Sequence, residues 1–131
     1  MSPFSSRIGE IQTQQDNFGA MVNGVAETQT IVVAANERLM WFGSVLSAPV
    51  AVNIDMTVTL RTGGGLRLEY TARFDNFDQN LLWMHPPFGT YMSGGAGGDL
   101  TIDVTADGAA GLTGCTVVTY FDLRVADVYS S

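Results

Sequence analysis

The sequence predicts an all-β fold, an antiparallel β-sandwich that is jelly-roll-like. Three observations support this prediction. Apolar and polar residues alternate from Val52 to Arg61 and again from Leu66 to Phe74, which is the period of a strand with one buried face. Glycine-rich turns separate the alternating stretches, and no long helical pattern lies between them. This pattern is typical of roughly six to eight short strands in two packed sheets.

The expected strands follow one another from Thr28 to Val125. The first is the β-branched stretch TQTIVVAA, and the apolar run over residues 38–46 indicates a strand buried on both faces. The two alternating stretches form a hairpin at Thr62-Gly63-Gly64-Gly65, because glycine supplies the positive φ angles of a tight reversal. Further strands are expected over residues 100–107 and 115–125. The order of the strands in the sheets does not follow from these patterns.

Residues 1–27 differ from the rest because they are polar and rich in amide side chains. Phe18, Met21, Val22 and Val25 are spaced three and four residues apart, as on one face of a helix. This segment is either a short helix or loop packed on its own domain, or an arm that orders against a neighbouring subunit. We therefore expect an extended or partly helical N-terminal arm over residues 1–27 and a single β-sandwich domain over residues 28–131.

The composition excludes some classes of partner. Apolar residues make up 46% of the 131 residues and charged residues only 15%, which leaves little charge to cover a surface. We therefore expect another protein to cover part of it. The net charge is −7, and the six basic residues are all arginines scattered along the chain. Because nucleic-acid binding needs a clustered basic patch, we expect no nucleic-acid partner.

The residues that usually carry catalysis are scarce. His85 and Cys115 are the sole histidine and cysteine, whereas a nucleophile needs an adjacent base and a zinc site needs more ligands. Asp99, Asp103 and Asp107 share one face of an expected strand, and glycoside hydrolysis uses a pair of carboxylates. Because these aspartates alternate with threonines, a solvated face explains them better. We expect no enzyme, no catalytic residue, no cofactor and no metal.

Apolar residues also gather around a Pro-Pro pair, where proline and glycine disfavour a regular core element. Because loops lie on the surface, an aromatic, methionine-rich loop is a predicted partner contact. The predicted contact residues are Trp83, Met84, His85, Phe88, Tyr91 and Met92. The alternative is that this loop folds back as a lid over one end of the sandwich.

Targeting signals are not evident in the sequence. The N-terminus lacks the apolar core of a signal peptide, and no stretch approaches the roughly 20 apolar residues of a membrane span. A lone cysteine forms no internal disulfide, so the fold does not depend on an oxidising compartment. We expect an unprocessed protein without a signal peptide that is made in the cytoplasm.

The architecture expected from Thr28 to Val125 resembles that of small jelly-roll virion proteins, such as phage capsid decoration and minor capsid proteins. The resemblance rests on architecture and on no motif, so no residue role is transferred. It implies a non-enzymatic structural protein of the virion that self-assembles as a homo-oligomer, with a trimer favoured, and binds a capsid lattice. The alternative is a carbohydrate-binding module with Trp41, Trp83, Phe88 and Tyr91 as a stacking platform.

Overall fold

The fold is known from a computed structural model that describes residues 11–48, 54–63, 65–74, 80–86, 91–92, 98–107 and 113–125. These residues contain no helix and form strands and the connections between them. The strands are β1 (Gln12–Asn17), β2 (Glu27–Ile31), β3 (Glu37–Ala48), β4 (Ile54–Thr62), β5 (Arg67–Phe74), β6 (Asn80–Met84), β7 (Tyr91–Met92), β8 (Leu100–Asp107) and β9 (Thr116–Val125). The prediction of an all-β fold is confirmed.

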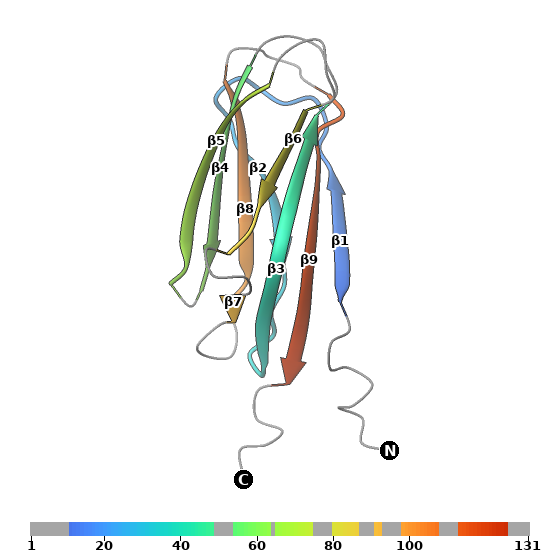
Figure 1. The fold of residues 1–131 in the computed structure, drawn as a ribbon, viewed down its shortest axis with the longest axis vertical. Helices are drawn as coiled ribbons and strands as arrows, with labels where there is room; N and C mark the ends of the chain where they lie inside the picture. The colour runs from blue at the N-terminus through green and yellow to red at the C-terminus, as the bar shows by residue number, and fades with distance from the viewer. Residues whose placement is uncertain are drawn as a thin grey trace.

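The strands form two antiparallel sheets that pack face to face (Figure 1). Sheet 1 has the order β1-β9-β3-β6, with β7 also paired to β3, and sheet 2 has the order β2-β8-β4-β5. The pairs β4 with β5, β3 with β6, β2 with β8 and β1 with β9 are nested around the β4–β5 turn. A long hairpin rolled up in this way, so that successive pairs alternate between sheets, is a jelly roll. The jelly-roll-like sandwich is therefore confirmed.

The core lies between the two sheets and follows from the alternation of the sequence. On β4 and β8, every second side chain points inward and is buried, whereas the residues between them point to solvent. The buried residues of these two strands are Ile54, Met56, Val58, Leu60, Leu100, Ile102, Val104 and Ala106. Burying a large aliphatic side chain contributes about 1.5–3 kcal/mol, so these two strands supply much of the cohesion of the sandwich.

Strand β3 changes face at a β-bulge, which explains its unbroken apolar sequence. Trp41 pairs with Phe121 and Gly43 with the adjacent Tyr120, so Phe42 is an extra residue. The backbone of Gly43 has a φ of 148°, and a Cβ there would lie 2.9 Å from the carbonyl oxygen of Met84. Glycine alone fits this conformation and this contact. Inward residues therefore occupy odd positions before the bulge and even positions after it.

A chain of hydrogen bonds crosses the core beside this bulge. Trp41 Nε1 donates to Ser44 Oγ at 3.0 Å, the hydroxyl oxygens of Ser44 and Thr119 lie 2.7 Å apart, and the Thr119 hydroxyl donates to Gln29 Oε1 at 2.5 Å. Because the single hydroxyl proton of Thr119 goes to Gln29, Ser44 must be the donor to Thr119. The chain therefore has one direction, from Trp41 in sheet 1 to Gln29 in sheet 2.

The amide of Gln29 ends this chain on the backbone of sheet 1. Its Nε2 donates to the carbonyl oxygens of Gln14 in β1 at 3.1 Å and of Val117 in β9 at 3.2 Å. Both protons of the amide thus have acceptors, and among the described residues no buried side-chain nitrogen or oxygen lacks a hydrogen-bond partner. A satisfied buried network of this kind favours one arrangement of the strands over its alternatives.

The structure corrects the prediction for residues 11–27, which belong to the sandwich rather than to an arm outside it. Gln12–Asn17 forms β1 and pairs with β9, and the side chains of Phe18 and Met21 are buried in the core. The spacing of Phe18 and Met21 suggested a helical face, but these residues come directly after strand β1. The amide of Phe18 donates to the carbonyl oxygen of Cys115 at 2.9 Å, which continues the pairing of β1 with β9. Residues 1–10 of the predicted arm lie outside the described residues.

We predict that Thr119→Val lowers the free energy of unfolding by about 1–3 kcal/mol, because the isosteric valine leaves Gln29 Oε1 without a donor and the Ser44 hydroxyl proton without an acceptor. Urea denaturation measures this loss. The matched control is Thr57→Val on the exposed face of β4, which should change stability by less than about 0.5 kcal/mol. Equal stability of the two variants would contradict the role assigned to the hydrogen-bond chain.

We predict that Gly43→Ala destabilises the protein by about 1–3 kcal/mol, because alanine is strained at this positive φ and meets the Met84 carbonyl oxygen. Thermal and urea unfolding measure the effect. Gly19→Ala is the control, since a Cβ at Gly19 has no other atom within 4 Å. A Gly43→Ala variant as stable as the control would show that the bulge accepts a side chain.

Candidate docking face

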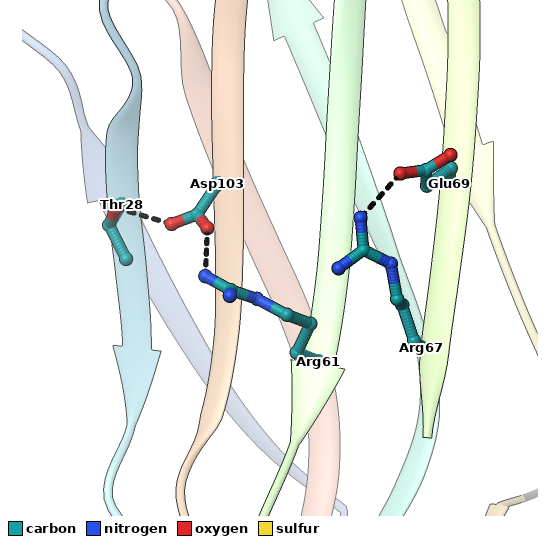
Figure 2. A network of polar contacts seen from close by, with 5 residues as sticks. All are labelled: Thr28, Arg61, Arg67, Glu69 and Asp103. Atoms are coloured by element: carbon teal, nitrogen blue, oxygen red, sulfur yellow. Dashed lines mark hydrogen bonds and ion pairs between the residues drawn. The ribbon is translucent and has the colours of Figure 1, made fainter. Parts of the chain in front are cut away.

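The outer face of sheet 2 is polar, and its charges pair with one another. Asp103 of β8 accepts hydrogen bonds from the Thr28 hydroxyl at 2.6 Å and from the Arg61 guanidinium at 2.6 Å, as Figure 2 shows. Arg67 and Glu69 of β5 form a second ion pair at 2.7 Å, also drawn in Figure 2. Such exposed pairs each contribute at most about 1 kcal/mol to stability, so this face is a solvated surface rather than a source of cohesion.

The carboxylates considered as catalytic candidates serve local structure. Asp99 Oδ1 accepts a hydrogen bond from the amide of Val33 at 2.9 Å, and Asp103 is held by Thr28 and Arg61. Within the described ranges, no three histidine, cysteine, aspartate or glutamate side chains are grouped closely enough to hold a metal ion. The arrangement of these aspartates is that of a solvated sheet face.

The outer face of sheet 1 is different because three successive rows of described residues across it carry no charge. The first row is Asn17, Thr116, Ser47 and Leu81. The second row is Gln15, Val118, Val45 and Trp83. The third row is Thr13, Tyr120 and Gly43. Charged residues begin beyond these rows, where Asp122 lies opposite Met40 and Arg124 opposite Arg38.

An apolar surface lies on the β6 side of these rows. Trp83 and Leu81 point outward from β6 and are 61% and 56% exposed. The half-buried side chains of Val45, Val118 and Tyr120 continue this surface across β3 and β9. We call these five residues the Trp83 face. Exposed apolar residues that are contiguous across strands mark sites of contact with other molecules.

The predicted contact residues lie in different surroundings. Trp83 is exposed on β6, whereas Met84 is fully buried in the core and so belongs to the fold rather than to the surface. His85 follows β6 and is exposed, and its carbonyl oxygen accepts a hydrogen bond from the Tyr70 hydroxyl at 3.1 Å. Tyr91–Met92 forms β7, which pairs with β3. Phe88 lies outside the described residues.

Part of the segment predicted as a loop is therefore strand, and the Trp83 face contains residues that sequence reasoning did not select. Leu81 shares a strand face with Trp83, a spacing of two that the sequence shows. Val45 and Val118 lie beside Trp83 because of the order of the strands in sheet 1, and that order cannot be predicted from a local sequence pattern. Two pairings bring them together, Val45 with Trp83 and Val45 with Val118.

The structure removes one residue from the aromatic platform expected for a carbohydrate-binding module. Trp41 is fully buried, and its indole nitrogen donates to Ser44. It therefore cannot stack on a ligand beside Trp83. Of the four aromatic residues expected to form that platform, Trp83 is the one whose side chain the structure places on the surface.

Comparison with known proteins finds chains of similar fold but does not assign this chain to a family. No protein-family model matches the sequence, and no curated protein matches it. The fold is similar to that of chains from infectious bursal disease virus. A chain of its T13 viral particle aligns with a TM-score of 0.53 and 11% identity, over 89% of this chain and 31% of that chain.

Two further structures of this virus give the same result. A chain of its T=1 particles aligns with a TM-score of 0.52 and 10% identity, over 89% of this chain and 36% of the other. The VP2 subviral particle aligns with a TM-score of 0.51 and 13% identity, over 92% and 34%. This chain thus spans about a third of the length of each. The resemblance to jelly-roll virion proteins is confirmed as a likeness of architecture.

Cys115, the sole cysteine of the chain, is limited in its reactivity by its position. The thiol of Cys115 is fully buried, and this burial raises its pKa to about 11. Among the described residues there is no helix long and apolar enough to cross a membrane.

We predict that Cys115 does not react with a chromogenic disulfide reagent at pH 8 in the folded protein. The thiolate is the reactive form, and a pKa of about 11 keeps the thiol protonated well above neutral pH. After unfolding in urea, the same reagent should titrate one thiol per chain, since the sequence has one cysteine. Rapid reaction of the native protein, without loss of structure, would show that the thiol is accessible.

Proposed function

We propose that this chain is a non-enzymatic, self-assembling structural protein of a virus particle, of the kind represented by capsid decoration and minor capsid proteins. The observation that carries the proposal is the contrast between its two outer faces. The outer face of sheet 2 carries three ion pairs, whereas that of sheet 1 has uncharged rows and an exposed tryptophan. Large aromatic side chains dominate the energetics of protein interfaces.

The fold supports a role in a particle. The similar chains come from particles of infectious bursal disease virus, where a jelly roll occurs within a chain about three times as long. Because one fold hosts many functions, this likeness supports the proposal without carrying it. The positions of the two groups most often used as nucleophile or base also agree with it. Cys115 is buried before β9, and His85 is exposed after β6.

The charges favour protein partners over nucleic acid. Arg61, Arg67 and Arg73 all lie on the outer face of sheet 2, and each is paired with a carboxylate within 3.0 Å. Those arginines therefore do not form a cationic patch that could displace counterions from a phosphate backbone. The proposed partners are further copies of the chain, with a trimer favoured, and a capsid lattice. The proposed location is the virion, assembled in the host cytoplasm.

We predict that Trp83→Ala raises the dissociation constant of the oligomer at least tenfold, because a central interface tryptophan commonly contributes about 2 kcal/mol or more. Size-exclusion chromatography with light scattering over a range of concentrations measures this change. Val32→Ala is the matched control, since Val32 is 67% exposed and lies outside the Trp83 face.

Two outcomes would contradict the proposal. A chain that is strictly monomeric and binds glycans would instead be a ligand-binding module. A Trp83→Ala variant that loses thermal stability while its association stays intact would show that Trp83 supports the fold rather than a contact.

A further inference from the structure

We propose that two copies of this chain join edge to edge through β6, around a two-fold axis beside Leu82. In this arrangement, Leu81 of each copy faces Trp83 of the other. The inference rests on the proposed function and deepens it, because it names a second copy of the chain as the partner at the β6 side of the Trp83 face. It concerns this one contact and is compatible with a further, three-fold contact elsewhere on the molecule.

The side of the sandwich formed by β1 and β2 is closed to an added strand. Gln14 Nε2 donates to the carbonyl oxygen of Thr30 at 2.9 Å, and Gln29 Nε2 donates to that of Gln14 at 3.1 Å. These bonds link the edge strands of the two sheets to each other. They use carbonyl groups that an incoming strand would need, and a covered edge of this kind resists strand addition.

The edge of sheet 2 at β5 is protected by charge. Arg67, Glu69 and Arg73 alternate along this strand and are exposed, with ion pairs to neighbours on the same face. Charged side chains on an edge strand oppose its pairing with another chain because pairing brings them close to a second set of charges. A second copy of β5 paired in the register centred on Tyr70 would set Arg67 of each copy opposite Arg73 of the other.

Strand β6, the last described strand at the other edge of sheet 1, lacks these protections. Its sequence, Asn80-Leu81-Leu82-Trp83-Met84, has no charged residue, and Leu81 and Trp83 are more than half exposed. The strand ends before Pro86, which lacks the amide proton of a sheet donor. At the residue before Pro86, the Tyr70 hydroxyl of β5 donates a hydrogen bond to the carbonyl oxygen of His85 and so anchors the chain to β5. The edge open to pairing is therefore residues 80–84.

The two-fold register at Leu82 follows from the side chains. An antiparallel pair centred there uses all five residues of β6 and sets Asn80 opposite Met84 of the other copy. Residues directly opposite each other share a face, so both Leu81–Trp83 pairs lie on the outer face of sheet 1. Val45 is already the neighbour of Trp83 within each copy. The contact would join the two apolar surfaces into one and extend sheet 1 over both copies.

The charge of the chain favours this location for a contact between copies. Each copy carries a net charge of −7, so two copies repel one another unless they meet where charge is absent. A two-fold contact uses the same patch on both sides, and that patch must complement itself. An uncharged strand that sets leucine against tryptophan meets this requirement.

A charge-exchange experiment tests the inference. One double variant carries Leu81→Lys and Trp83→Lys, and the other carries Leu81→Glu and Trp83→Glu. Each alone would place like charges opposite one another, so we expect its association to weaken at least thirtyfold. In an equimolar mixture, each introduced lysine would face a glutamate, and association should recover at least tenfold. Native mass spectrometry, with one variant carrying a mass tag, identifies the mixed pairs.

The matched controls place the same charges on the other sheet. Thr57 and Thr71 are exposed, directly opposite neighbours on β4 and β5. The double variants with lysine or glutamate at these two positions should associate as the parent does. Circular dichroism establishes that every variant is folded. If a double variant at β6 loses structure, Trp83→Lys mixed with Leu81→Glu replaces it: each variant alone sets its charge opposite an apolar side chain, and the mixed pair sets lysine opposite glutamate.

Each adverse outcome has a distinct meaning. If both β6 double variants associate like the parent, the contact lies elsewhere; the inference is overturned, although the oligomer and the proposed function stand. If each dissociates and the mixture does not recover, β6 docks on a different surface of its partner, and the two-fold pair is overturned. A parent that stays monomeric yet binds capsids overturns the β6 pair and the self-assembly in the proposed function, and leaves the structural role in a particle standing. A monomer that binds no capsid overturns both proposals.

Discussion

The hydrogen-bond chain from Trp41 to Gln29 is the constraint on which the arrangement of the two sheets depends. Apolar contacts hold the sheets together without selecting one alignment, whereas this chain needs particular atoms at particular places. It needs the bulge at Gly43, which turns Ser44 inward toward Thr119. The same bulge turns Val45 outward beside Trp83. A β3 strand without the extra residue would reverse both orientations, so the interior network and the exterior docking face share one cause.

The strands β4, β5 and β8, and with them the fold class, could be predicted from the sequence. Each of these strands has one face in the core, so apolar and polar residues alternate along it. β1 could not be predicted in this way. Its residues are polar, and the amide of Gln14 bonds to the carbonyl oxygen of Thr30 across the edge of the sandwich. The helical spacing of Phe18 and Met21 was misleading for a related reason, since both are core residues of an irregular connection.

The candidate site was predictable in part. The exposed tryptophan was selected correctly as a surface residue, but its loop setting was wrong because the Pro-Pro pair lies after the strand rather than within it. Met84 is buried because side chains alternate along β6, so the residue next to the outward Trp83 points into the core. The other members of the Trp83 face come from β3 and β9. Their proximity depends on pairings between distant parts of the chain, which single-residue patterns do not encode.

The nested pairing of the strands also sets an order of folding events. The β4–β5 hairpin is the pairing with the shortest separation in sequence, and β1 with β9 the longest, so closure of sheet 1 is entropically the slowest step. Val118 and Tyr120 arrive with β9. A chain in which β9 has not yet paired therefore presents β6 and Val45 without Val118 and Tyr120. The surface proposed for assembly becomes complete at the step that also completes sheet 1.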